Sequence, residues 1–369
     1  MRSVGVEEEL LLVDPRTGEP AASAGAVLAS AIRTGGRAAG ADGEIPLEKE
    51  LHKQQVEFAT KPVTMMGELG EEILRWRAEA ARHAEAAGMV VAALATCPTR
   101  VEPSLSRGER YQWIGRQFGL TAQEQLTCGC HVHVSVDSDE EGVAVLDRIR
   151  PWLSVLTALS ANSPFWQGED TGYGSYRSRV WNRWPSAGPV SVFGSADRYH
   201  ERVRAMLATG ALRDEGMIYF DARLAASYPT VEIRVADVCL DAGTPVLLAA
   251  LTRGLVDTAS RAWQAGEPPS QVDTALLRLA AWRAARSGLD GPLIHPVTLA
   301  ETSPEDVVWA LYEHVRDALE ENGDAERVRA GLVELQERGT GARVQRALLR
   351  DEGDLAAVVT RCARLTLGG

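Results

Sequence analysis

The chain has 369 residues, of which 45% are hydrophobic and 24% charged, a composition typical of a globular protein. Its net charge of −12 argues against non-specific binding to nucleic acid or to an anionic membrane. It contains no apolar run of about eighteen residues, so we expect no membrane span.

The start of the chain and the cysteines point to one compartment. The segment that begins at Met1 lacks the apolar core of a secretory signal. The cysteines are an odd number scattered through a large chain: Cys97, Cys128, Cys130, Cys239 and Cys362. We therefore predict a cytoplasmic protein without structural disulfides.

Strand and helix signals follow one another unevenly along the chain. Apolar or alternating runs bounded by turn residues predict strands over 4–13, 53–60, 89–96, 130–136 and 231–235. Helices are expected in 21–43 (a short one, before a loop), over 67–88 and 140–161, and from 245 onward with breaks at 266–269 and 288–296. Residues 162–189 show neither period, which is typical of a lid or binding loop.

Strands with long connections come first and helices come last. This order favours an α+β fold with a largely antiparallel sheet rather than regular βαβ alternation. No composition shift marks a domain boundary. We therefore expect one catalytic domain over 1–369, with the sheet in 1–250 and a mostly helical part in 251–369.

The first predicted strand carries Glu7, Glu8 and Glu9 in succession. In a strand Glu7 and Glu9 point to one face, and Glu8 points to the other. Two adjacent carboxylates repel each other, and a divalent cation such as Mg²⁺ removes that cost. The alternative interpretation is a solvated acidic strand edge. The second strand adds Glu57, with Glu50 shortly before it.

The strand over 130–136 places His131 and His133 on one face. Three interpretations stay open here: a zinc site that includes Cys128 and Cys130, a hydrogen-bonded pair on the sheet, or one imidazole on a metal and one near a nucleotide. Cys130 points away from His131, and no second cluster has zinc-finger spacing. This argues against zinc.

In the last predicted strand, Glu232 and Arg234 share a face. The pair fits an ion pair on the sheet surface. It also fits a phosphate site, in which Glu232 holds a metal and Arg234 holds a transferring phosphoryl group.

Five segments in order resemble the type 2 glutamate–cysteine ligases, also called carboxylate–amine ligases. They are GVEEEL (5–10), QVEFAT (55–60), CGCHVHV (128–134), ANSPFW (161–166) and PTVEIRVADVC (229–239). The resemblance covers roughly residues 4 to 250. It implies a glutamine-synthetase-like fold: a curved, mainly antiparallel sheet with helices packed on its outer face.

The resemblance also implies a reaction and its residues. ATP phosphorylates a carboxylate, glutamate being favoured, and an amine such as that of cysteine attacks the acyl phosphate to form an amide. Two or more Mg²⁺ ions, or Mn²⁺, would be bound. The residues implied for one ion are Glu9, Glu50 and Glu57, and for the other Glu7, His131 and Glu232. His133 would lie near the nucleotide phosphates and Arg234 would stabilise the migrating phosphoryl group.

The long segment 162–189 offers arginines for an amino-acid substrate. A guanidinium fork suits an α-carboxylate, so Arg177 is the first candidate and Arg179 the second. The alternative is that both arginines only anchor the loop.

Other functions remain open at this stage. A catalytically silent paralogue that binds nucleotide or an amino acid would keep the same residues, and a guanidine phosphotransferase would form no amide. The resemblance implies small-molecule partners and a dimer or tetramer, and it does not specify the acid or the amine.

Overall fold

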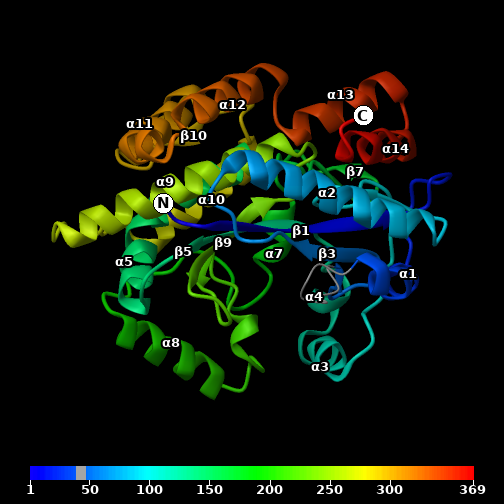
Figure 1. Ribbon diagram of the computed structural model, residues 1–369, viewed down its shortest axis with the longest axis horizontal. Helices are drawn as coiled ribbons and strands as arrows, with labels where there is room; N and C mark the ends of the chain where they lie inside the picture. Colours follow the sequence, from blue (N-terminus) through cyan, green and yellow to red (C-terminus); the bar gives the residue numbers. More distant parts are fainter. Residues whose placement is uncertain (39–46) are drawn as a thin grey trace.

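A seven-stranded sheet lies at the centre of the protein, for which the computed structural model describes residues 1–38 and 47–369 (Figure 1). Its strands are β1 (Val4–Val13), β2 (Leu47–Lys49), β3 (Gln55–Ala59), β4 (Val90–Ala92), β5 (Gly129–Ser135), β8 (Ala222–Leu224) and β9 (Thr230–Asp237). They run in the order β2-β3-β1-β5-β9-β8, with β4 also paired to β1, and each pairing is antiparallel. The predicted α+β class is confirmed.

The alternation of residue types along the strands decides which face meets the helices. In β5, one face carries Cys130, Val132 and Val134, and all three side chains are buried in the hydrophobic core. His131 and His133 occupy the other face, because successive strand residues point in opposite directions. The apolar face is therefore free to pack on helices, and the polar face is left for a site.

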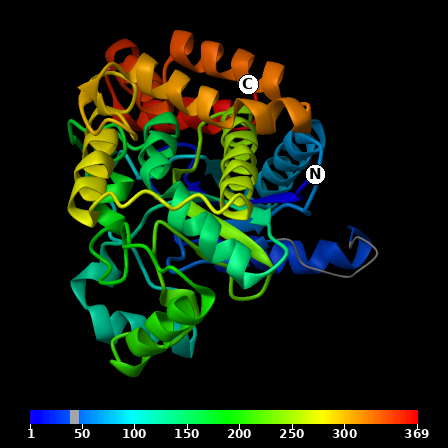
Figure 2. The ribbon, with the colours of Figure 1, turned by 90° about the vertical axis from the view of Figure 1, so that its left-hand side faces the viewer.

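Helices cover the apolar face in layers, as the two views in Figures 1 and 2 show. The elements of this side are α2 (Met66–Glu85), α9 (Gly243–Gln264), α11 (Pro304–Asn322), α12 (Ala325–Arg338), α13 (Gly341–Glu352) and α14 (Leu355–Thr366). α9 contacts β1 and β5 on one side and α11 and α12 on the other. Every residue from 244 to 256 is buried, as expected of a helix enclosed on all sides.

The remaining elements border the sheet or its other face. They are α1 (Ala24–Ala38), α3 (Glu109–Phe118), α4 (Leu120–Gln123), α5 (Asp139–Ile149), α6 (Leu153–Leu159), α7 (Arg177–Trp181), α8 (Ala196–Ala208), α10 (Thr274–Ser287), the 3₁₀ turns η1 (Arg150–Trp152) and η2 (Glu215–Met217), and the short strands β6 (Phe165–Trp166), β7 (Glu169–Asp170), β10 (Leu293–Ile294) and β11 (Glu301–Thr302). Figure 1 shows α3 and α8 across the sheet from α2 and α9. None of the described helices has the length and apolarity needed to cross a membrane.

Several predicted boundaries were wrong. The helix expected over 140–161 is divided into α5 and α6, because Pro151 lacks the N–H that an uninterrupted helix needs. The segment 162–189 is not structureless, since it contains the β6–β7 hairpin and α7. The second C-terminal break, expected over 288–296, contains β10, and its partner strand β11 lies just beyond it. The strand expected over 89–96 spans only β4. Part of the loop expected before 43 lies outside the described residues.

Candidate active site

The strand register sets acidic and imidazole side chains side by side on the polar face of the sheet. The directly opposed pairs are Glu9 with Glu57, Glu7 with His131, and His133 with Glu232. Residues opposite each other in a ladder share a face and lie within contact distance. Four strands that are far apart in the sequence therefore supply one polar surface.

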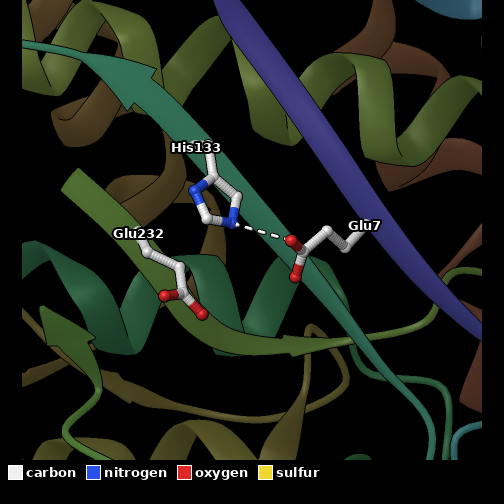
Figure 3. Close-up of side chains that lie close together, drawn as sticks. All are labelled: Glu7, His133 and Glu232. Atoms are coloured by element: carbon white, nitrogen blue, oxygen red, sulfur yellow. Dashed lines mark ion pairs between the residues drawn. The ribbon is translucent and has the colours of Figure 1, made fainter. Parts of the chain in front are cut away.

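Glu7, His133 and Glu232 converge from three adjacent strands (Figure 3). The Nε2 atom of His133 lies 3.2 Å from Oε1 of Glu7, and one ligand atom from each of the three residues lies within 4.8 Å of the others. His131 approaches the same carboxylates, with its Nδ1 at 3.2 Å from Glu7 Oε2 and 3.9 Å from Glu232 Oε1. Both imidazoles thus lie beside Glu7 and Glu232.

A second cluster is made of carboxyl groups alone. Carboxylate oxygens of Glu9, Glu50 and Glu57 lie within 4.8 Å of one another, and Glu57 also joins Glu7 and His131 in a third group. Burial, followed by the charge of Glu50, raises the pKa of Glu9 to about 8. Burial and repulsion from Glu50, Glu7 and Glu9 raise the pKa of Glu57 well above its usual value. Such crowded carboxyl groups cannot all ionise unless a cation neutralises them.

Arginines dominate the other end of the polar face. Glu232 forms ion pairs with Arg234 and with Arg223, whose Nε lies 2.7 Å from Glu232 Oε2. Burial opposes its ionisation, but Arg234 and Arg223 lower the pKa of Glu232 to about 2. Burial and the Arg234 charge lower the pKa of His131 to about 4. His131 is therefore a neutral imidazole near pH 7 with a free nitrogen lone pair.

These side chains line a large cavity. Its volume is about 1350 Å³, and its wall includes residues of β1, β3, β5 and β9 together with Arg110, Tyr111, Trp181, Tyr219 and Tyr228. Pockets for one small molecule usually measure roughly 300–1,000 Å³. The cavity is therefore large enough to hold more than one small molecule at once.

The donor set fits hard divalent cations. Glu9, Glu50 and Glu57 offer only oxygen atoms, and the other groups add one imidazole nitrogen to carboxylates. The buried Nε2 of His131 has no hydrogen-bond partner among the residues that the structure describes. Oxygen-rich ligand sets of this kind suit Mg²⁺ and Mn²⁺ rather than Zn²⁺. The predicted ligands Glu7, Glu9, Glu50, Glu57, His131 and Glu232 thus all lie in these clusters, and His133 joins them.

Glu8 and the cysteines lie away from this face. Glu8 points into the helix-covered side, where it forms a buried ion pair with Arg77 of α2. Cys128 and Cys130 are buried among apolar side chains, and burial raises the pKa of each thiol well above its usual value. All five cysteines of the chain are free, in agreement with the prediction of no disulfides.

Arg177 and Arg179 do not line the large cavity. They line a smaller one of about 420 Å³ beside it, and Trp181, Trp184 and Arg234 border both cavities. The buried Arg177 packs so close to β5 that any side chain at Gly129 would collide with its guanidinium group. Arg177 and Arg179 therefore lie next to the acidic clusters, and the side chains that line both cavities stand between them.

Sequence reasoning missed Arg223. This residue lies on β8, forms an ion pair with Glu232 and lines the large cavity. β8 has only three residues, too few for an alternating pattern to be recognised. A second missed feature is the bulge in β9, where Arg234 and Val235 together lie opposite His131. The bulge is visible only in the pairing of the strands.

Comparison with known proteins identifies the family. The model of glutamate–cysteine ligase family 2 matches residues 3–361. A Streptomyces avermitilis protein provisionally named glutamate–cysteine ligase 2-1 is 61% identical over 368 residues, covering 100% of both chains. A Streptomyces coelicolor protein provisionally named glutamate–cysteine ligase 2 is 61% identical over 367 residues, covering 99% of each.

Solved structures show the same fold at low sequence identity. A glutamate–cysteine ligase from Francisella tularensis, solved in complex with AMP, has a TM-score of 0.70 at 14% identity and covers 100% of this chain and 89% of its own. A bifunctional glutathione synthetase from Pasteurella multocida also has a TM-score of 0.70 at 14% identity, covering 100% of this chain and 52% of its own. With the whole-chain relatives, these findings make the protein a member of glutamate–cysteine ligase family 2 and an enzyme that forms carbon–nitrogen bonds.

Proposed function

We propose that the protein is an ATP-dependent carboxylate–amine ligase that joins glutamate, through an acyl phosphate, to cysteine or another amine. The observation that carries the proposal is the convergence of the carboxylate and imidazole groups with Arg234 in one large cavity. The names of the relatives support glutamate and cysteine as substrates, and the AMP complex of a protein with this fold supports a nucleotide.

Two ion sites follow from the geometry of the clusters. Glu9, Glu50 and Glu57 would hold one Mg²⁺ or Mn²⁺ ion, and Glu7, Glu232 and an imidazole would hold the other. His133 is closer to this second role than the sequence indicates, because it completes the group with Glu7 and Glu232. When bound, such ions neutralise the phosphate oxygens of a nucleotide and hold them in line for transfer.

Protein side chains do the remaining work of positioning. Arg234 is buried and ion-paired with Glu232, so its guanidinium group is held beside the proposed ion site, where it would stabilise a migrating phosphoryl group. The phosphoryl group moves from ATP to the substrate carboxylate, and ADP leaves. The amine then attacks the acyl carbon, phosphate departs and an amide forms. Arg223 helps to fix the orientation of Glu232.

We also place the reaction in the cytoplasm, because all five cysteines are unpaired, as is usual in a reducing compartment. A homo-oligomer remains a prediction.

The proposal is tested by ADP release with Mg²⁺, glutamate and a panel of amines, with mass spectrometry of the product. We expect ADP and an amide in equal amounts. ADP release with no amide and with a phosphorylated guanidine would mean a phosphotransferase instead. No ADP release with any acid and amine, despite binding of Mg²⁺ and ATP, would mean a silent paralogue.

A further inference from the structure

A second cavity adjoins the acidic clusters and has a different charge. Its volume is about 420 Å³, and its wall is formed by α6, α7, α10 and β9 with the segments that join them. The charged residues on its wall are Arg177, Arg179, Arg183, Arg234, Arg278 and Asp221. Five arginines against one carboxyl group make this a positively charged pocket beside the carboxylate clusters.

Three of these five arginines form no ion pair within 4 Å of a described carboxylate, although Arg177 lies over the Trp181 ring at 5.4 Å. Arg177 is only 1% exposed, its side chain makes one hydrogen bond (Nη2 to the Arg234 carbonyl, 3.4 Å), and its Nε has no partner. Arg179 and Arg278 form no side-chain hydrogen bond or ion pair with any described residue. Arg183 differs, because its Nη1 lies 2.7 Å from Glu124. A buried guanidinium with unused donors indicates an anionic ligand.

Asp221 is the one acidic residue among the described residues that line this cavity. It directly precedes β8, and its backbone carbonyl accepts a hydrogen bond from Arg234 N at 2.9 Å. Its carboxylate accepts no hydrogen bond from a described residue, and burial raises the pKa of Asp221 to about 7. A carboxylate left without donors suits an ammonium group.

The uncharged part of the wall combines polar residues (Ser154, Thr157, Ser178 and Asn182) with apolar ones, and it adjoins the proposed reaction centre. Leu279, Trp282 and Trp181 provide apolar surface, and Trp181 and Arg234 are shared with the large cavity. A ligand whose head group is held in the small cavity would need a chain that extends past Arg234 to reach the large cavity. A dicarboxylic amino acid has this form: a zwitterionic head, an aliphatic chain and a second carboxylate.

We propose that the small cavity binds the head group of the acid substrate, with the α-carboxylate on Arg177, Arg179 and Arg278 and the α-ammonium on Asp221. This rests on the proposed ligase function and deepens it, because it separates the binding of the head group from the activation of the side-chain carboxylate. Free phosphate would also suit the arginines, but it gives no role to Asp221.

The test is a calorimetric titration with three matched probes, each with and without Mg·ADP. L-Glutamate has both head charges, glutarate lacks the ammonium group, and 4-aminobutyrate lacks the α-carboxylate. Wild type should bind L-glutamate at least about tenfold more tightly than either analogue. Arg179→Ala and Arg278→Ala should weaken L-glutamate binding by about 10- to 100-fold and leave 4-aminobutyrate binding unchanged.

Asp221→Asn should instead remove the preference for L-glutamate over glutarate. Arg283→Ala is the matched control, because Arg283 also lies on α10 but pairs with Glu301 at 2.9 Å and does not line the cavity. Each variant should bind Mg·ATP as wild type does, so a defect in the metal site is recognised separately.

Three results would overturn the proposal and leave the ligase function standing. The first is L-glutamate binding by wild type that is no tighter than the binding of glutarate and 4-aminobutyrate. The second is L-glutamate binding that Arg179→Ala and Arg278→Ala do not weaken. The third is an affinity for inorganic phosphate that equals the affinity for L-glutamate and does not change in Asp221→Asn.

Discussion

The two faces of β1 use the same residue type in opposite ways. Glu8 on one face is fully buried and paired by two oxygens with Arg77, whose Nε and Nη2 both lie 2.8 Å away. Glu7 and Glu9 on the other face lie among carboxyl groups and imidazoles. Neighbouring side chains of β1 therefore have different roles: the one on the helix-covered face stabilises the fold, and those on the other face belong to the candidate active site.

The difference lies in how each charge is satisfied. Arg77 neutralises Glu8 and also donates to the carbonyls of Cys239, Leu240 and Thr366, so this face is complete without a ligand. Glu9 has one backbone donor, Gly129 N at 2.7 Å, and a neighbouring carboxyl group that repels it. The crowded face therefore gains most from a bound cation, and the paired face gains nothing.

The largest effect is expected from Glu57→Gln. Glu57 belongs to two of the three candidate metal groups, so its loss should lower Mg²⁺-dependent ATP turnover by about a thousandfold, equivalent to roughly 4 kcal/mol in the barrier. The melting temperature of the metal-free protein should not fall, because the variant removes a repelled carboxyl group. Steady-state ADP release and thermal unfolding measure the two quantities. Near-normal turnover would remove Glu57 from the site.

The opposite outcome is expected for Glu8→Gln. It leaves the buried Arg77 without its counter-charge, which should lower the free energy of unfolding by about 3–5 kcal/mol. Urea denaturation measures this change. Below its melting temperature the variant should keep the metal affinity of wild type, and a loss of affinity without a loss of stability would contradict the separation of the two faces.

A smaller effect concerns pH. The pKa of Glu9 is about 8 in the fold, above its ordinary value of 4.5, so the folded state binds its proton more tightly than the unfolded chain does. This stabilisation is complete below about pH 4.5 and is lost as the pH rises through about 8. Between pH 6.5 and 8, metal-free wild type should lose about 1–2 kcal/mol relative to Glu9→Gln. Parallel stability curves for the two proteins would contradict this.

The smallest effect is expected from the thiols. Cys130→Ala removes a buried atom from the apolar core and should cost about 1 kcal/mol of stability, with turnover unchanged. Iodoacetamide should not inactivate the native enzyme, because all five cysteines are buried. Rapid inactivation that follows alkylation of Cys128 or Cys130 would give a thiol a role in the reaction.

The residues of the polar face could be predicted from the sequence, because alternate side chains of a strand point to the same face. It separated Glu8 from Glu7 and Glu9, and His131 from Cys130, as the structure does. It could not assign which imidazole joins which carboxylate, since that depends on the register of β5 with β9 and on the bulge at Arg234.

Other site residues could not be predicted because their positions depend on packing between distant parts of the chain. Placing Arg177 and Arg179 in a separate cavity requires α10 to pack against α7, a contact between residues about a hundred positions apart. Arg223 was missed because β8 is short, and Asp221 because a single acid in a connecting segment gives no pattern. Helix limits failed where Pro151 interrupts an otherwise helical pattern.

Divalent cation binding is the claim on which the rest depends. Calorimetric titration of Mn²⁺ at pH 8 should compare wild type with Glu57→Gln and with Glu326→Gln, an exposed carboxylate of α12 that serves as a control. We expect wild type and Glu326→Gln to bind alike, and Glu57→Gln to bind at least about tenfold more weakly. Equal affinity in all three proteins would contradict a metal site on this face of the sheet.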